Sequence, residues 1–157
     1  MAQEYPDIPQ QEIISFLKNP ANYPVGVETV DVHETHGAMI FLAGDFAYKI
    51  KKAVKFPYMD FSTLAKRQHF CERELSINQP GAPEIYVGLT AITKEADGSL
   101  AFSGSGQTVE WAVKMKRFEQ EMMLDRLPHG RVTEKALIKN LATSVLDYHQ
   151  KAPIEKT

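Results

Sequence analysis

Residues 46–58 hold four lysines among aromatic and aliphatic side chains. The alternation of residue types predicts that this stretch begins as a β-strand. Ala47, Lys49 and Lys51 would then share one face, and three apolar side chains would share the other. A lysine ammonium is a good phosphate ligand, but lysines also protect the solvated edges of sheets. The stretch is therefore either an anion site or a charged edge strand.

The spacing of Ala47 and Lys49 matches the Ala-x-Lys pattern of the third strand of protein kinases. In that pattern the small residue leaves room for adenine, and the lysine reaches the α- and β-phosphates of ATP. A glutamate on the next helix must pair with the lysine, and Glu72 and Glu74 are the candidates. At 3.6 residues per turn Glu74 lies beside Cys71 on the packed side of the helix, whereas Glu72 lies towards solvent. We therefore expect Glu74 to pair with Lys49, because a carboxylate on a packed side is costly without a cation.

The elements that must position these residues can be predicted from periodicity and breaker residues. A short helix is expected between Pro9 and Asn19-Pro20. The further expected elements are strands at 27–34, 39–42 and 46–50, a helix from 60 to 79 capped by Asp60 or Ser62, strands at 85–94, 99–102 and 109–118, a flexible loop at 103–107, and helices around 122–127 and 133–151. The expected fold class is α+β, with an antiparallel sheet of about five strands and one packed helix, followed by further helices.

Several segments taken together carry a more specific signal than any single motif. They are Phe41-Leu42-Ala43-Gly44-Asp45-Phe46-Ala47-Tyr48-Lys49-Ile50-Lys51-Lys52, then Met59-Asp60-Phe61-Ser62-Thr63-Leu64, and the single positions Phe56, Arg67, Cys71, Glu74, Asn78, Pro83 and Tyr86. This joint pattern resembles the N-terminal region of the bacterial aminoglycoside phosphotransferase family, in particular the branch often fused to a P-loop ATP-binding domain. The resemblance runs from about residue 30 to residue 118 and is weaker beyond.

The resemblance implies a protein-kinase-like small lobe that binds ATP with magnesium, in a kinase that phosphorylates a small-molecule hydroxyl. Lys49 would contact the phosphates, Glu74 would hold Lys49, and Ala47 would leave space for adenine. The hinge that bonds adenine would be the backbone of Met115, Lys116 and Arg117. The implied organisation is an N-terminal helix and connection (1–26), the nucleotide-binding lobe (27–118) and the first helices of an incomplete C-terminal lobe (119–157).

The parts of such a kinase that perform phosphoryl transfer are missing from this sequence. An H-x-D segment should position the acceptor hydroxyl, and a later Asp should bind magnesium, yet none of the five histidines has Asp two places on. Asp60-Phe61-Ser62 mimics a metal-binding motif but precedes the glutamate helix, the reverse of the kinase order. We therefore expect no catalytic residue and no metal ligand in this chain, and no ATP turnover by it alone. A truncated product and a remnant with another use both stay open.

Composition excludes several function classes. With 18 basic and 20 acidic side chains among 157 residues, the formal net charge is -2, so no general attraction to nucleic acid or anionic lipid is expected. No apolar run approaches the roughly 20 residues that span a bilayer, and the N-terminus lacks the order of a signal peptide, which predicts a cytoplasmic protein without a membrane partner. The single cysteine, Cys71, excludes an intramolecular disulfide and a cysteine-cluster zinc site.

Two alternatives to the kinase interpretation remain. Residues 46–58 could serve a non-catalytic module that binds nucleic acid or a protein partner through lysines and aromatic rings, although the acidic balance disfavours nucleic acid. The chain could also be an interaction domain that forms a homodimer through a helical face. The sequence does not disclose a phosphoryl acceptor.

Overall fold

The structure is a computed structural model that describes residues 9–24, 26–118, 123–124, 126–128, 131 and 133–152. The chain divides into two compact units, Met1–Arg117 and Phe118–Thr157. The elements of the described residues are α1 (Gln10–Lys18), the 3-10 helix η1 (Pro20–Asn22), β1 (Val30–Glu34), β2 (Ala38–Ala43), β3 (Phe46–Lys51), β4 (Lys55–Phe56), β5 (Met59–Asp60), α2 (Leu64–Asn78), β6 (Tyr86–Lys94), β7 (Leu100–Phe102), β8 (Gln107–Lys116) and α4 (Lys135–Lys151).

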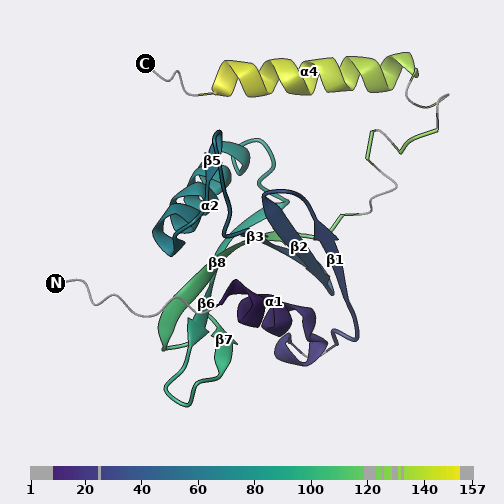
Figure 1. Ribbon diagram of the computed structural model, residues 1–157. Coiled ribbons are helices and arrows are strands. Elements are labelled where there is room, and N and C mark those ends of the chain that lie inside the picture. The colour runs from purple at the N-terminus through teal and green to yellow at the C-terminus, as the bar shows by residue number, and fades with distance from the viewer. Residues whose placement is uncertain are drawn as a thin grey trace. The chain divides into compact units, whose positions relative to one another are not determined.

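The first unit is built on one antiparallel sheet with the strand order β1-β2-β3-β8-β6-β7 (Figure 1). The expected α+β class is confirmed, and the sheet has six strands instead of about five. β8 lies between β3 and β6, so that Ala47 of β3 and Tyr86 of β6 both face Met115 of β8 across the ladder. The strand with the lysines is therefore an interior strand of the sheet and not a charged edge.

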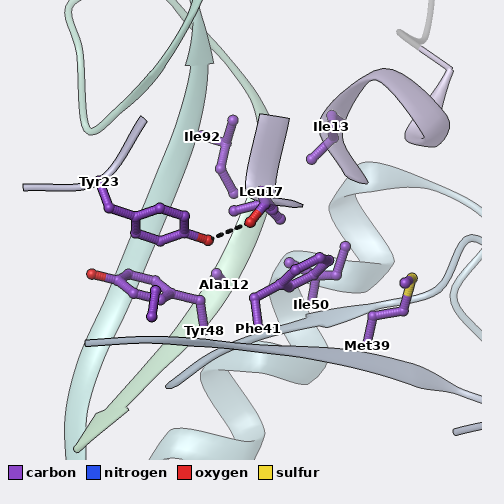
Figure 2. Close-up of a cluster of buried hydrophobic side chains, with 10 residues drawn as sticks. Ile13, Leu17, Tyr23, Met39, Phe41, Tyr48, Ile50, Ile92 and Ala112 are labelled. Carbon is purple, nitrogen blue, oxygen red and sulfur yellow. Dashed lines mark hydrogen bonds between the residues drawn. The ribbon is translucent and has the colours of Figure 1, made fainter. Parts of the chain in front are cut away.

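One face of the sheet is covered by α1 (Figure 1). Pro9 precedes this helix and Asn19-Pro20 follows it, as expected from the sequence. Ile13 and Leu17 are fully buried against the sheet, and the Tyr23 hydroxyl donates to the Leu17 carbonyl at 2.7 Å (Figure 2). The buried cluster on this face consists of Ile13, Leu17, Tyr23, Met39, Phe41, Ala43, Tyr48, Ile50, Ile92 and Ala112. The N-terminal helix thus supplies part of the core of the first unit.

The opposite face carries α2, which begins one residue after Thr63. The prediction that Asp60 or Ser62 caps this helix is wrong, because it is the Thr63 hydroxyl that accepts the Lys66 N–H at 3.3 Å. Asp60 instead ends a small hairpin, β4–β5, and accepts hydrogen bonds from Ser62. Strands of two residues are too short to show alternation, so the hairpin was not predicted.

The connection between β7 and β8, expected as a flexible loop, is held by the Glu95 carboxylate. The hydroxyls of Thr93 and Ser105 and the N–H of Gly106 all donate to this carboxylate. The loop also crosses β6 so closely that a Cβ atom on Gly106 would lie 2.0 Å from the Lys94 carbonyl oxygen. Glycine is therefore required here for lack of space.

In the second unit α4 forms over nearly the predicted residues. The helix predicted over 122–127 lies partly outside the described residues, and its described part forms a turn in which the N–H groups of Arg126 and Leu127 donate to the Met123 carbonyl. Among the described residues no helix combines the length and the apolar character needed to cross a membrane.

Candidate functional site

The centre of the candidate site is Glu74 of α2, whose carboxylate binds two lysines of β3. Lys49 Nζ lies 2.8 Å from Glu74 Oε1, and Lys51 Nζ donates to Glu74 Oε2. The side chains of Lys49, Lys51 and Glu74 are 26%, 12% and 11% exposed. The expected pairing of Lys49 with Glu74 is therefore present, whereas the contact of Lys51 with the same carboxylate was not predicted.

The two lysines determine the protonation of the carboxyl between them. Burial alone would raise the pKa of Glu74, but hydrogen bonds and charge from Lys49 and Lys51 outweigh burial, so the pKa of Glu74 lies below its ordinary value. Burial raises the pKa of the neighbouring Cys71 thiol to about 12 and the pKa of Tyr86 above its usual value. At neutral pH Glu74 is thus a carboxylate, while the Cys71 thiol and the Tyr86 phenol are neutral.

A second, fully buried ion pair fixes α2 against the sheet. Arg67, two turns before Glu74, directs its Nε at both carboxylate oxygens of Glu110 in β8, each at 2.9 Å. Glu110 is completely buried and Arg67 nearly so. Gln10, the first residue of α1, also donates to Glu110 at 2.9 Å and to the Lys51 carbonyl at 2.8 Å. Both helices are therefore tied to the place where β3 ends beside β8.

Sequence reasoning missed Glu110 as a positioning residue. The available signal was a single carboxylate within an otherwise apolar stretch of a predicted strand, Val109-Glu110-Trp111-Ala112-Val113. A buried carboxylate needs a cation, and Arg67 on the packed side of the preceding helix α2 is the partner that it finds.

Ala47 lies on the same face of β3 as the two lysines and is buried. Its neighbours across the ladder are Leu42 of β2 and Met115 of β8. Of the two faces of β8, the one with Ala112 packs in the core under α1, so the one with Val113 and Met115 shares the side of Ala47. Of these residues, the resemblance places Ala47 beside adenine, and Val113 and Met115 are the apolar side chains that share its face.

The predicted hinge is part of the sheet and uses some of its backbone donors there. The N–H of Lys116 donates to the Ile85 carbonyl and the N–H of Arg117 to the Asp45 carbonyl, each at 2.8 Å. An adenine bonded at residues 115–117 must therefore use other backbone groups, such as carbonyl oxygens. The assignment of Met115, Lys116 and Arg117 to adenine stays a prediction.

Exposed rings gather where the β1–β2 turn meets the β4–β5 hairpin. Phe56 and Tyr58 are stacked at 5.8 Å between centroids, with an interplanar angle of 10°, and His36 lies 6.4 Å from each. Below them Gly37 lies so close to Met59 that a Cβ atom would meet the methionine methyl at 2.8 Å. By contrast Phe46 and Tyr48 lie on the face covered by α1, so the predicted lysine and aromatic stretch is split between two faces.

The family resemblance also implies magnesium, which is held in proteins by oxygen ligands. Nowhere in the part of the chain that the structure describes do three His, Cys, Asp or Glu side chains gather as a metal would require. The described residues therefore do not offer magnesium a set of ligands.

Comparison with known proteins gives relatives without a stated activity. Uncharacterized proteins of Mycobacterium bovis and Mycobacterium tuberculosis are each 30% identical to this chain over 123 residues, which is 78% of this chain and 23% of each relative. The chain thus spans less than a quarter of the length of these curated relatives. No family model matches the chain. No solved structure matches it either. The resemblance to aminoglycoside phosphotransferases therefore stays a prediction.

Proposed function

We propose that the first unit is the ATP-binding lobe of an aminoglycoside-phosphotransferase-like kinase, a cytoplasmic enzyme class that transfers the γ-phosphate of ATP to a small-molecule hydroxyl. The observation that carries the proposal is the ion pair between Lys49 and Glu74 at 2.8 Å, on the sheet face that also holds Ala47. The order of elements supports it, because three strands of the main sheet precede the helix with the glutamate and further strands follow.

Each residue has a defined task in this proposal. Glu74 holds the Lys49 ammonium above the sheet, and Lys49 donates to phosphate oxygens and so orients them. Ala47 leaves room for the purine beside Met115. Glu110 and Arg67 act as positioning residues, because they hold the helix that carries Glu74. Transfer to an acceptor needs further groups, to which no residue of this chain is assigned.

The test is a titration of the full chain with ATP, with and without magnesium, followed by nuclear magnetic resonance and calorimetry. We expect weak binding, with a Kd on the order of 1 mM, because a lobe with one wall of a cleft leaves much of the nucleotide in water. Resonances of Ala47, Met115 and Lys49 should shift together. Lys49→Met should weaken the binding of ATP and leave the binding of adenosine unchanged. Lys52→Met is the control, because it removes a lysine that pairs with Glu34 on the surface, and it should change neither affinity.

Two outcomes of the ATP titration would argue against the proposal. One is ATP binding that Lys49→Met leaves unchanged, and the other is a set of shifted resonances that excludes the face of Ala47. Binding of adenosine and ATP with equal affinity would also contradict a role of Lys49 at the phosphates.

The ring cluster of His36, Phe56 and Tyr58 favours one second candidate, a module that binds single-stranded nucleic acid. Tyr58 is 75% exposed, and exposed rings stack with bases. Such binding should fall steeply with salt and should be lost in Tyr58→Ala, whereas binding of ATP at Lys49 should be retained in that variant. Fluorescence anisotropy of labelled oligonucleotides at two salt concentrations distinguishes the two candidates.

A further inference from the structure

We propose that Lys51 is a second phosphate ligand beside Lys49, so that the site selects a chain of phosphate groups and not a single phosphate. This inference rests on the proposed function, since it concerns the same site, and it names the ligand class as a nucleoside diphosphate or triphosphate. The lysine pattern of protein kinases assigns only Lys49 to this task.

The first argument is geometric. Lys49 and Lys51 are two residues apart on one strand, so their Cα atoms are about 7 Å apart and their side chains point to the same side. Both reach the same carboxylate, one at each oxygen of Glu74. The two ammonium groups therefore converge on one small region, where adjacent phosphate groups can contact both.

The second argument is the charge balance. Among the residues that the structure describes, Glu74 is the one carboxylate within ion-pair distance of either lysine. The nearby Cys71 cannot compensate, because the pKa of its thiol is about 12, and Glu110 is already paired with Arg67. A charge of +1 therefore remains among side chains that are mostly buried, where an unpaired charge is unfavourable.

Two other carboxylates, Glu34 and Asp60, also pair with lysines in this part of the chain. Lys52 pairs with Glu34 at 2.6 Å, and Lys66 pairs with Asp60 at 2.6 Å. Asp60 also lies 3.9 Å from Lys55, but the side chains of Lys66 and Lys55 are 46% and 73% exposed, so water screens the excess charge at Asp60. Among these ion pairs, the excess positive charge is largely buried where Glu74 meets Lys49 and Lys51, and an anion with several oxygens is the ligand that balances it.

The experiment titrates the full chain with inorganic tripolyphosphate and with monophosphate at low salt, followed by nuclear magnetic resonance. Wild type should bind tripolyphosphate at least about tenfold more tightly than monophosphate, since each added charge-assisted hydrogen bond contributes about one order of magnitude. Lys51→Met should lose about this factor for tripolyphosphate, while the matched surface variant Lys52→Met should remain within about twofold.

A Glu74→Gln variant separates direct binding from positioning. If Lys51 binds phosphate directly, adding Lys51→Met to this variant should still weaken its binding of tripolyphosphate by about tenfold. If Lys51 acts only by holding Glu74, Lys51→Met should have no further effect on tripolyphosphate binding once Glu74 is Gln, which would overturn the inference. If Lys51→Met fails to fold, Glu74→Gln still provides a test, because it retains both lysines. Tripolyphosphate should then raise the melting temperature of Glu74→Gln.

Unchanged tripolyphosphate binding in Lys51→Met, or equal binding of monophosphate and tripolyphosphate by wild type, would overturn the inference. Its failure is distinguishable from failure of the proposed function. ATP that binds no better than tripolyphosphate contradicts an adenine site but leaves the two-lysine site in place. ATP that binds better than tripolyphosphate and is insensitive to Lys51→Met contradicts the second ligand alone.

Discussion

Glu74 shows how a single side chain determines both the stability and the charge of the site. Its carboxylate serves two cations, and its side chain is 11% exposed. Residue types and helical spacing were sufficient to predict its pairing with Lys49. They did not predict Lys51 as a partner, because the direction of a long flexible side chain depends on the helix opposite and not on its own strand.

The depressed pKa of Glu74 predicts a pH dependence of stability. A carboxyl whose pKa is lower in the folded chain stabilises the fold above its unfolded pKa, about 4.3, and this contribution is lost as the pH falls through the folded value. Wild type should therefore lose stability below about pH 4.3 more steeply than Glu74→Gln. Urea unfolding between pH 3 and pH 7 measures the free energy of unfolding of both proteins. If it falls equally with pH in wild type and in Glu74→Gln, the carboxyl is not coupled to folding.

The buried pair of Arg67 and Glu110 should contribute far more than a surface pair. Glu110→Gln should destabilise the fold by about 3–5 kcal/mol, because it leaves a buried guanidinium without its counter-charge. The surface pair of Lys94 and Glu12 provides the control, and Glu12→Gln should cost less than about 1 kcal/mol. Chemical denaturation of both variants gives the comparison, and similar losses would contradict the assigned importance of the buried pair.

At the scale of elements, local sequence signals predicted the helices and strands whose ends are marked by proline or by tight turns. α1, β2 and β3 occur close to the predicted residues. The beginning of α2 was predicted three residues or one residue too early, because Asp60 and Ser62 are as good as Thr63 as caps in isolation. Asp60 is part of the β4–β5 hairpin, and this pairing leaves Thr63 as the residue that caps α2. The pairing is a tertiary contact, which local sequence does not reveal.

The packing of α1 predicts that the N-terminal helix is part of the cooperative fold. Leu17 is fully buried under the sheet, so Leu17→Ala should lower the free energy of unfolding by about 2–5 kcal/mol. Ser15→Ala, on the exposed side of the same helix, should change it by less than about 0.5 kcal/mol. Thermal unfolding followed by circular dichroism measures the stability of both variants. If Leu17→Ala is as stable as wild type, the sheet does not require α1.

At the scale of the molecule, the first unit holds the sheet, both packed helices and every residue of the candidate site. A chain that ends after Arg117 should therefore unfold in one cooperative transition, with resonances of Lys49 and Glu74 like those of the full chain. Circular dichroism and nuclear magnetic resonance of residues 1–117 test this. A broad, uncooperative transition would show that the first unit depends on the residues that follow.

The position of β8 between β3 and β6 has a consequence for the folding kinetics. β1 to β3 form one set of local hairpins and β6 with β7 another, whereas β3 and β8 pair residues as distant as Phe46 and Lys116. Closing that long loop costs more entropy than closing a hairpin, so the pairing of β3 with β8 should form late in folding. Val113→Ala, on β8 opposite Lys49, should therefore mainly speed unfolding and change the folding rate little. If stopped-flow measurements showed that Val113→Ala mainly slows folding, the pairing of β3 with β8 would belong to the folding nucleus instead.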